Sequence, residues 1–389
     1  MEKRKFIKPG KIRTRQDFIR MTNPKGRDYI IGIDVGYSST VSFHEKGAFI
    51  FPSYAREIDF GSMQMISDRD IFYRDDDTGT VYLVGYSAQN IIDDEDTNDT
   101  EGELFARNRY TSRLFGIICD TAIGLALEHK HDSRRVIIQT GLPTAYMKQD
   151  QRLIRNAFSK NRRFSIKRGE GEWKSYEPHI APADVHVIAQ PMGALYSAMT
   201  KSDGTYTQNA MKILKSNVLV MDIGFGTGDF YGIRDRMVEC CDSINDIGMH
   251  EVLRRVSEKL NEQEGMEVRV PQLQKALEKG RAVKFDAETL TSQDVSITEY
   301  VNEASNEVME KAFEKARSIT KSFRGYRYLI VAGGTGEAWF DYIAGRLEGM
   351  KTLEVMKSNI NDGLPFVYSI ARGYYMTALA SGRAGKDRR

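Results

Sequence analysis

Apolar residues follow two kinds of pattern along this chain. Some form short unbroken runs that end near glycine or proline, as buried strands do, and others recur every three or four residues, as on one face of a helix. Strands are predicted at 29–36, 40–53, 80–84, 134–143, 183–190, 218–234, 236–245 and 326–333, with a hairpin at 162–180. Helices are predicted at 104–130, 149–160, 191–200, 248–265, 270–280, 297–323 and 365–380. Order is expected to begin near Tyr29, because the preceding residues lack an apolar period.

Strands and helices alternate in both halves of the chain, which predicts an α/β protein with mixed sheets. With 389 residues, the chain is long enough for two domains that each have a core. The segment 200–217 is polar and rich in turn-forming residues, and it separates the two sets of elements. We therefore expect the domain boundary there.

The composition is that of a soluble globular protein, with 41% hydrophobic and 28% charged residues. No apolar stretch approaches the length of a membrane span, and no apolar segment follows the basic N-terminus as in a secretory signal, so no membrane partner is expected. Cys119, Cys240 and Cys241 are too few and too unevenly spaced for a disulfide framework or a zinc site. These features favour a cytoplasmic location.

The net charge of +2 hides a strong asymmetry between the ends and the body of the chain. Residues 1–28 carry seven more basic than acidic residues, and the tail 381–389 carries three more. The body between them therefore has eight more acidic than basic residues. The basic ends can be solubilising and flexible, or the N-terminal arm can contact an acidic partner such as DNA or another copy of the chain.

Two similar motifs carry the candidate chemistry. In "IIGIDVGYSST" (30–40) and "VMDIGFGTGDF" (220–230), an apolar run ends in an aspartate, and glycines and hydroxylated residues follow. Glycine lets the backbone N–H groups converge on an anion such as phosphate. A carboxylate beside phosphate requires a cation between them, and Mg²⁺ is commonly held by one or two carboxylates together with phosphate oxygens. Asp34 and Asp222, one in each half, are the candidate pair.

A third glycine loop, "VAGGTGEA" (331–338), again follows an apolar run and precedes a helical pattern. It can bring a nucleoside close to the backbone, or it can be only a tight turn between a strand and a helix. Neither of the first two loops has the spacing of the P-loop or of the dinucleotide-binding fingerprint, which disfavours both of those folds.

The motifs DVGYSST, TGLP, AQPMGALY, DIGFGTGD and VAGGTGE, in this order, resemble the ATPase superfamily of actin, heat-shock chaperones and sugar kinases. Within it, the chain resembles bacterial actin-like plasmid segregation proteins of the ParM type, because TGLP is followed by YMKQD and the last helix contains ARGYY. The resemblance covers about residues 29–380. It implies duplicated actin-like (ribonuclease H-like) domains, with mixed sheets flanked by helices and a nucleotide in the cleft between them.

The resemblance also implies a domain organisation. We expect a basic, flexible arm at 1–28, actin-like domain I at 29–216, actin-like domain II at 217–361, and at 362–389 a C-terminal helix that returns to domain I, followed by the basic tail.

By the same resemblance, three loops bind the nucleotide. The first phosphate hairpin would contribute Asp34, Gly36, Ser38, Ser39 and Thr40; the second Asp222, Gly224, Gly226, Thr227, Gly228 and Asp229; and the adenosine motif Gly333, Gly334, Thr335, Gly336 and Glu337. Asp34 and Asp222 would hold Mg²⁺ through water. The helix 270–280 lies where the family covers the base or ribose, so Lys275, Glu278 and Lys279 are candidates there, although these residues can equally form a solvated helix face.

Gln190 stands where the superfamily places a Glu or Gln that positions the attacking water, and ParM-type proteins are expected to have a glutamate there. A glutamine can orient a water molecule but cannot accept its proton. With Gln190, Asp34 and Asp222 as the catalytic set, we expect slow, conformation-gated hydrolysis. The alternative is that Gln190 only caps the helix that begins at Pro191.

The resulting hypothesis is a filament-forming, Mg²⁺-dependent ATPase, which can also use GTP, whose hydrolysis is coupled to filament disassembly. Its expected partners are other copies of itself and a DNA-binding adaptor protein, with plasmid DNA bound only indirectly. Two alternatives stay open: a small-molecule kinase, which would need a carboxylate base facing a substrate cleft, and a non-polymerising regulatory ATPase.

Overall fold

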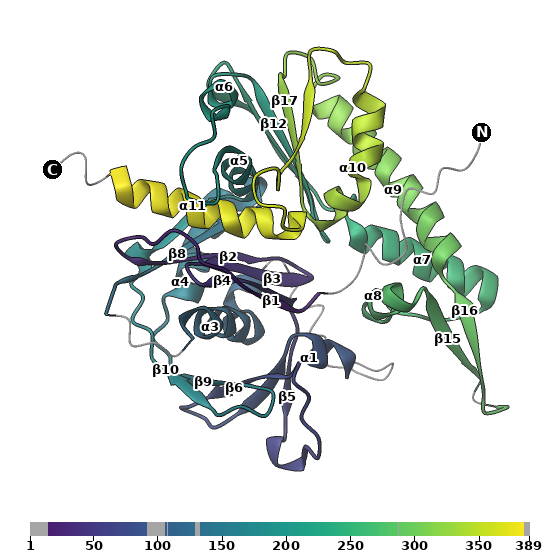
Figure 1. The fold of residues 1–389 in the computed structure, drawn as a ribbon. Helices are drawn as coiled ribbons and strands as arrows, with labels where there is room; N and C mark the ends of the chain where they lie inside the picture. The colour runs from purple at the N-terminus through teal and green to yellow at the C-terminus, as the bar shows by residue number, and fades with distance from the viewer. Residues whose placement is uncertain (1–14, 92–105, 107, 129–132, 287, 385–389) are drawn as a thin grey trace.

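The computed structural model describes residues 15–91, 106, 108–128, 133–286 and 288–384. Strands and helices alternate through the chain, and Figure 1 shows that the elements form two halves with helix α11 (Ser369–Ala384) between them. The other helices are α1 (Tyr86–Asn90), α3 (Arg113–Leu127), α4 (Met147–Phe158), α5 (Gln190–Met199), α6 (Ala210–Leu214), α7 (Met249–Glu264), α8 (Val270–Lys279), α9 (Thr298–Ile319) and α10 (Gly334–Leu347). None of the helices in these residues is long and apolar enough to cross a membrane.

The first half contains two sheets. The larger has the order β1-β4-β3-β2-β8-β11, formed by β1 (Asp17–Arg20), β2 (Tyr29–Val35), β3 (Ser39–His44), β4 (Gly47–Pro52), β8 (Val136–Leu142) and β11 (Val185–Ala189). The second has the order β10-β9-β6-β7-β5, formed by β5 (Ala55–Ile58), β6 (Ile71–Asp75), β7 (Val81–Val84), β9 (Phe164–Arg168) and β10 (Lys174–Tyr176). Helix α3 contributes a continuous buried face to the core of this half.

The second half is built around one five-stranded sheet of order β14-β13-β12-β17-β18. Its strands are β12 (Val218–Ile223), β13 (Gly228–Arg234), β14 (Met237–Ile244), β17 (Tyr328–Ala332) and β18 (Glu354–Lys357). A separate two-stranded sheet, β15 (Arg281–Asp286) and β16 (Thr291–Ser296), follows α8. The buried residues of α7, α8, α9 and α10 join the main sheet in one hydrophobic core.

The two halves repeat the same local topology at the two glycine motifs. In the first half, β2 pairs antiparallel with β3 on one side and parallel with β8 on the other. In the second, β12 pairs antiparallel with β13 and parallel with β17. Each motif is thus the turn of a hairpin whose first strand is internal to its sheet, which is why the two sequence patterns are alike.

Helices α5 and α11 cross closely where the halves meet. Both have a glycine at the crossing, and a Cβ placed on Gly373 would lie only 1.7 Å from the carbonyl oxygen of Gly193. The α11 helix also packs on β2. Substituting either glycine would force the helices apart, so these positions fix the spacing between the elements that carry the two hairpins.

The structure corrects the bounds of two predicted elements. Residues 40–53 form two strands, β3 and β4, because a turn at Glu45–Lys46 separates them. The helix predicted at 104–130 is shorter, because the Ser112 hydroxyl caps the backbone N–H of Phe115 and α3 begins at Arg113.

Part of the expected flexible arm is ordered in the structure. Strand β1 pairs antiparallel with β4 at the edge of the larger sheet, and the rings of Phe18 and Phe49 lie 5.9 Å apart. Order therefore begins before Tyr29. Four residues are too few to give an apolar period, so only the tertiary pairing reveals this strand. Residues 1–14 of the arm and 385–389 of the tail lie outside the described residues.

Candidate functional site

A cleft between the two halves collects most of the residues that the motifs predict. It lies at the hairpin turns that follow β2 and β12, and the loop after β17 closes one side of it. The predicted residues that line it are Asp34, Gly36, Ser38, Ser39, Gln190, Asp222, Gly224, Gly226, Thr227, Asp229, Gly333, Gly334, Thr335 and Glu337. Segments that are about 300 residues apart in sequence thus share one site.

Three of the predicted glycine-loop residues lie behind the cleft surface rather than in its lining. Thr40 is buried and shares a 2.9 Å hydrogen bond with the hydroxyl of Ser53. Gly228 lies against Ile247, and Gly336 lies in the first turn of α10 against Val331. These residues support the loops without facing the space that a ligand would fill.

Helix α8 reaches the cleft with a different face from the one we expected. Gln274 and Leu277 line the cleft, and both are buried. Lys275 instead donates a 2.9 Å hydrogen bond from Nζ to the carbonyl oxygen of Asn90, and Glu278 is exposed. Because a helix turns by about 100° per residue, positions next to the inward ones point elsewhere. The helix predicted from the sequence thus borders the cleft, but the candidate residues do not line it.

Three carboxylates face the cleft at close quarters. Asp34 is the last residue but one of β2, while Asp222 and Asp229 are cross-strand neighbours in β12 and β13. Burial, together with the nearby charges of Asp229 and Asp34, raises the pKa of Asp222 well above its usual value of 3.8. Burial raises the pKa of Asp229 to about 6, although hydrogen bonds from the hydroxyls of Ser243 and Thr227 oppose the change.

Such a group of buried carboxylates is stabilised in its charged form by a cation. Asp34 and Asp222 therefore fit the expected role of holding Mg²⁺, since a cation would favour the charged carboxylates whose pKa values burial raises. Among the described residues, no group of three or more His, Cys, Asp or Glu side chains is arranged to ligate a metal directly. The donor set thus suits a hydrated ion held through water and phosphate oxygens, which is how Mg²⁺ commonly binds.

Gln190 is the first residue of α5 and contacts the first carboxylate. Its Nε2 donates a 2.9 Å hydrogen bond to Oδ1 of Asp34. That bond and the positive charge of Arg109 lower the pKa of Asp34, but burial is the larger effect and raises it overall. The bond holds the Gln190 amide at the cleft surface, where an amide can orient a water molecule.

Two further residues of the cleft, Tyr37 and Arg109, were not predicted. Arg109 is 4% exposed, donates a 3.0 Å hydrogen bond to the carbonyl oxygen of Val35, and lies 4.2 Å from the centre of the Tyr37 ring. On its other side the ring touches Gly226, where an added Cβ would lie 2.5 Å from the Tyr37 Cδ2. Tyr37 therefore connects the two hairpins. Its position inside DVGYSST was a usable signal, whereas nothing in the sequence around Arg109 singles it out.

The third glycine loop is tied to the second hairpin. Gly333 has a φ of +81°, and a Cβ there would lie 2.2 Å from the carbonyl oxygen of Ile223. The Thr335 hydroxyl donates a 2.7 Å hydrogen bond to the carbonyl oxygen of Gly224. Glu337, one turn further along, accepts a 3.1 Å hydrogen bond from the backbone N–H of Phe366. Only a glycine at position 333 allows the loop to lie this close to the second hairpin.

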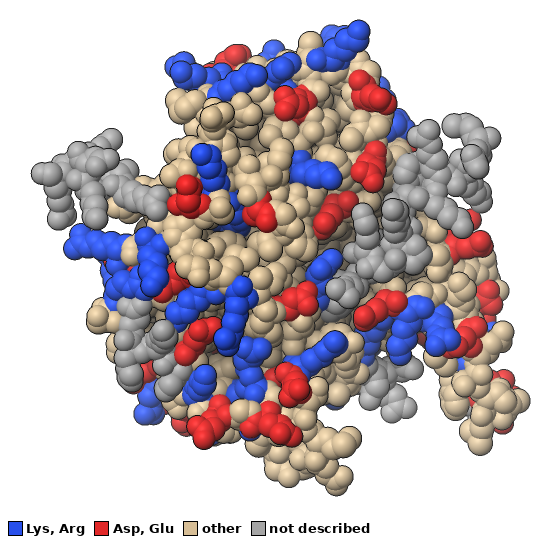
Figure 2. Space-filling view, viewed as in Figure 1, with Lys and Arg blue, Asp and Glu red and all other residues tan. Residues whose placement is uncertain are grey.

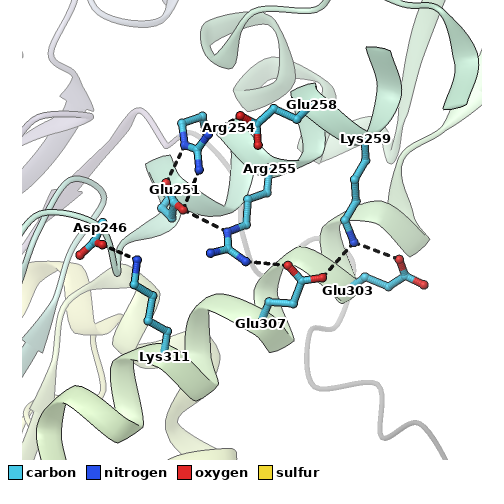
Figure 3. Close-up of polar contacts among 9 residues, drawn as sticks. All are labelled: Asp246, Glu251, Arg254, Arg255, Glu258, Lys259, Glu303, Glu307 and Lys311. Atoms are coloured by element: carbon cyan, nitrogen blue, oxygen red, sulfur yellow. Dashed lines mark hydrogen bonds and ion pairs between the residues drawn. The ribbon is translucent and has the colours of Figure 1, made fainter. Parts of the chain in front are cut away.

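The second hairpin is also joined to helix α7. The backbone N–H of His250 donates a 2.8 Å hydrogen bond to the carbonyl oxygen of Phe225. Figure 3 shows that α7 and the loop before it are each bound to α9 by ion pairs. The residues labelled there are Asp246, Glu251, Arg254, Arg255, Glu258, Lys259, Glu303, Glu307 and Lys311. The hairpin thus rests on a helix pair that is held together electrostatically.

Two protein families match the sequence, one in each half. The family described as the N-terminal domain of actin-like proteins matches residues 32–193. The family described as the C-terminal part of the archaeal actin homologue MreB-like proteins matches residues 220–340. A search of curated proteins finds no match.

Solved structures of actin homologues are similar to the whole chain at low identity. A non-polymerisable quadruple mutant of pCBH ParM has a TM-score of 0.69 at 17% identity, covering 90% of this chain and 98% of its own. A 15-stranded ParM filament from Clostridium botulinum has a TM-score of 0.67 at 19% identity, with coverages of 92% and 99%. An archaeal actin homologue in complex with ADP has a TM-score of 0.59 at 17% identity, with coverages of 90% and 99%. The fold is therefore the actin-like one that the sequence resemblance implies.

Proposed function

We propose that this chain, which matches models of actin-like protein families at residues 32–193 and 220–340, is a nucleotide-dependent, filament-forming ATPase that segregates plasmid DNA through a DNA-bound adaptor protein. One observation carries the proposal. Two glycine hairpins, one from each half, face a common cleft that also contains the carboxylates of Asp34 and Asp222 and the amide of Gln190. This arrangement suits a ligand with several phosphates and a bound Mg²⁺, with ATP or GTP as the nucleotide.

In this proposal, each group in the cleft has a distinct role. Backbone N–H groups of the hairpins bind the phosphates, and the loop 333–337 and the Gln274 face of α8 accommodate the nucleoside. Asp34 and Asp222 hold the hydrated Mg²⁺, which when bound offsets the negative charge of the phosphates. Arg109, buried beneath Tyr37, adds a fixed positive charge on the same side. Gln190 orients the attacking water without taking its proton, so hydrolysis is slow.

The nucleotide's contacts with both halves link hydrolysis to assembly. A nucleotide that contacts both halves stabilises the arrangement in which the halves lie close together, and each contact adds to this effect. Removing the terminal phosphate removes some of these contacts and therefore destabilises the closed arrangement. If subunits join filaments in the closed state, hydrolysis sets the time at which the filament disassembles. The similarity to a 15-stranded ParM filament and to an Alp12 filament supports self-association. Plasmid segregation in the cytoplasm, through an adaptor, follows from the resemblance to ParM.

Light scattering tests the proposal directly. Adding Mg²⁺ and ATP to the protein should cause scattering to rise after a short lag and then decay as phosphate is released, and EDTA should prevent the rise. GTP in place of ATP measures nucleotide preference. Phosphate release without scattering would identify a non-polymerising regulatory ATPase instead, and phosphate transfer to a sugar in a coupled assay would identify a small-molecule kinase.

A further inference from the structure

Arg109 is a buried cation at the cleft, and none of the described residues forms an ion pair with it. It lies in the short turn Arg109–Thr111 before α3 and is 4% exposed. An arginine at this depth is normally paired, because removing a charge from water without compensation is unfavourable. The charge therefore needs an explanation that the protein alone does not provide.

The charged side chains at the surface are placed differently. Figure 2 shows Lys and Arg side chains lying next to Asp and Glu over the visible face, where they are also in contact with water. Arg113, four residues after Arg109, has a side chain that is 55% exposed and lies 3.7 Å from a carboxylate oxygen of Asp75. Arg109 has neither water around it nor such a partner.

The guanidinium group of Arg109 also has hydrogen-bond donors that the fold does not use. A guanidinium carries five N–H donors. Nη2 donates a 3.0 Å hydrogen bond to the carbonyl oxygen of Val35, whereas Nε is buried and has no acceptor within the described part of the chain. The group is thus anchored at one nitrogen and unsatisfied at another.

Three aromatic rings hold this guanidinium in place. Its carbon lies 4.2 Å from the centre of the Tyr37 ring, 5.1 Å from that of Tyr110 and 5.6 Å from that of Phe115. The faces of such rings attract a cation, but the rings carry no net charge. They therefore fix the position of the positive charge without neutralising it.

Arg109 lies at the part of the cleft that contains the groups proposed to act in hydrolysis. It lines the cleft together with Asp34 and Gln190, and Val35, which accepts its hydrogen bond, directly follows Asp34 in β2. Burial raises the pKa of Asp34, and the Gln190 hydrogen bond and then the charge of Arg109 lower it in part. The guanidinium is thus close to the carboxylate proposed to hold Mg²⁺ and to the amide proposed to orient the attacking water.

We propose that Arg109 binds the terminal phosphate of the nucleotide and makes the cleft prefer a nucleoside triphosphate to a diphosphate. This inference rests on the proposed function, because it requires a nucleotide in the cleft. Phosphate oxygens supply both the negative charge and the acceptors that Arg109 lacks, and a planar guanidinium can donate two N–H bonds to one phosphate. The terminal phosphate is the relevant one, because it is the group that a water molecule oriented by Gln190 attacks.

The alternative is that Arg109 only anchors the turn before α3 and supports Tyr37. That role requires packing on the rings and one hydrogen bond, but it does not require a charge. A neutral side chain of similar length would pack there without the unfavourable burial of a cation. The two explanations differ in their consequences for binding, because an anchor should affect ATP and ADP equally, whereas a residue that binds the terminal phosphate should affect ATP alone.

Arg109→Met separates the two explanations. Methionine fills the space beside the rings without a charge, so the variant should fold, and Arg113→Met is the matched control on an exposed arginine of the same segment. Competition against a fluorescent ADP analogue, in the presence of Mg²⁺ and at protein concentrations too low for assembly, measures the affinities for ADP and for a non-hydrolysable ATP analogue. We expect Arg109→Met to weaken binding of the ATP analogue by about tenfold to a hundredfold and binding of ADP by less than about threefold, while Arg113→Met changes neither.

Equal losses of affinity for both nucleotides, or no loss for either, would overturn the proposal. If Arg109→Met does not fold, Arg109→Lys takes its place, because an ammonium group keeps the charge but not the planar arrangement of donors. The preference of that variant for the ATP analogue over ADP should fall by at least about threefold, and an unchanged preference would overturn the proposal as well. A parent protein that binds neither nucleotide counts against the proposed function itself, and this inference falls with it.

Discussion

At the scale of single residues, the cleft is defined by three buried carboxylates whose charged forms are disfavoured by burial. Asp34, Asp222 and Asp229 each have a raised pKa, and burial is the largest cause in every case. The protein maintains this unfavourable arrangement although neutral residues would pack more favourably there. A cluster of carboxylates with raised pKa values is characteristic of a functional site, where a bound ligand offsets the unfavourable burial of charge.

The raised pKa of Asp229 should make the stability of the protein depend on pH. Its folded pKa of about 6 exceeds its ordinary value of 3.8, so folding holds the proton to a higher pH than the unfolded chain does. The free energy of unfolding of the metal-free protein in EDTA should therefore fall as the pH rises from about 4 through about 6, by at most about 3 kcal/mol. Asp229→Asn should flatten this pH dependence. Denaturant titrations over a pH series measure it, and identical slopes for the two proteins would exclude Asp229 as the cause.

Substituting Gln190 should affect nucleotide hydrolysis more than nucleotide binding. Replacing it with alanine removes the amide beside Asp34 but leaves both glycine hairpins intact. We expect Gln190→Ala to slow phosphate release by about tenfold to a thousandfold while nucleotide affinity changes much less. If hydrolysis times disassembly, filaments of this variant should also persist longer after free ATP is removed. Filaments that disassemble at the parent's rate would contradict the timing role.

At the scale of secondary-structure elements, α7 supports the second hairpin, and its stability depends on buried charge. Glu251 is 7% exposed, and hydrogen bonds from Arg254 and Arg255 lower its pKa to about 2. The Glu251 carboxylate thus pairs with two guanidinium groups one turn further along α7, and Arg255 continues the network to Glu307 on α9.

Removing that carboxylate should measurably destabilise the helix pair. Glu251→Gln should lower the free energy of unfolding by about 2 kcal/mol at neutral pH, because it leaves two arginines without their buried partner. The matched control is Glu258→Gln, an exposed partner of the same Arg254, for which we expect less than about 0.5 kcal/mol. Since the Glu251 pKa is lowered, its contribution is present above pH 4.5 and is lost as the pH falls towards 2. Equal effects of the two variants in urea titrations would contradict a special role for Glu251.

The elements that the sequence predicted are those with a strong internal signal. Strands β2 and β12 are uninterrupted apolar runs, and α7 and α9 have long apolar periods, so composition and spacing suffice for them. Strand β1 and the β15–β16 hairpin were missed, because β1 is short and β15 and β16 are largely exposed, so neither has a regular apolar face.

The residues of the candidate site also fall into two groups, those that the sequence predicted and those that it did not. The glycine loops were found from the chain alone, because backbone geometry restricts which residues can occupy them. Arg109 and the inward face of α8 depend on which elements pack together across the cleft. That information is tertiary, and local patterns do not contain it.

At the scale of the whole molecule, the basic N-terminal arm of the chain can affect filament assembly. Residues 1–14 lie outside the described part of the chain and carry five more basic than acidic residues. Because β1 belongs to the sheet, a truncation that tests the arm should stop at residue 14 and leave β1 in place. If the arm bridges neighbouring subunits, this truncation should raise the critical concentration, and added salt should do the same to the full chain by screening beyond about 8 Å.

The outcomes of that truncation distinguish the roles left open for the arm. Equal critical concentrations with and without residues 1–14, over a salt series, would eliminate bridging. Binding of the full chain to duplex DNA that weakens steeply with salt and disappears on truncation would indicate direct DNA contact instead.

The central claim is that a nucleotide bound between the two halves drives this chain to polymerise, and negative-stain electron microscopy with Mg–ATP tests it most directly. The account predicts filaments with ATP and magnesium, none with EDTA, and none with Asp222→Ala, which should remain folded but lose both hydrolysis and assembly. Filaments that form equally well without nucleotide, or with Asp222→Ala, would contradict the claim, as would a parent protein that hydrolyses ATP and shows no filaments at any concentration.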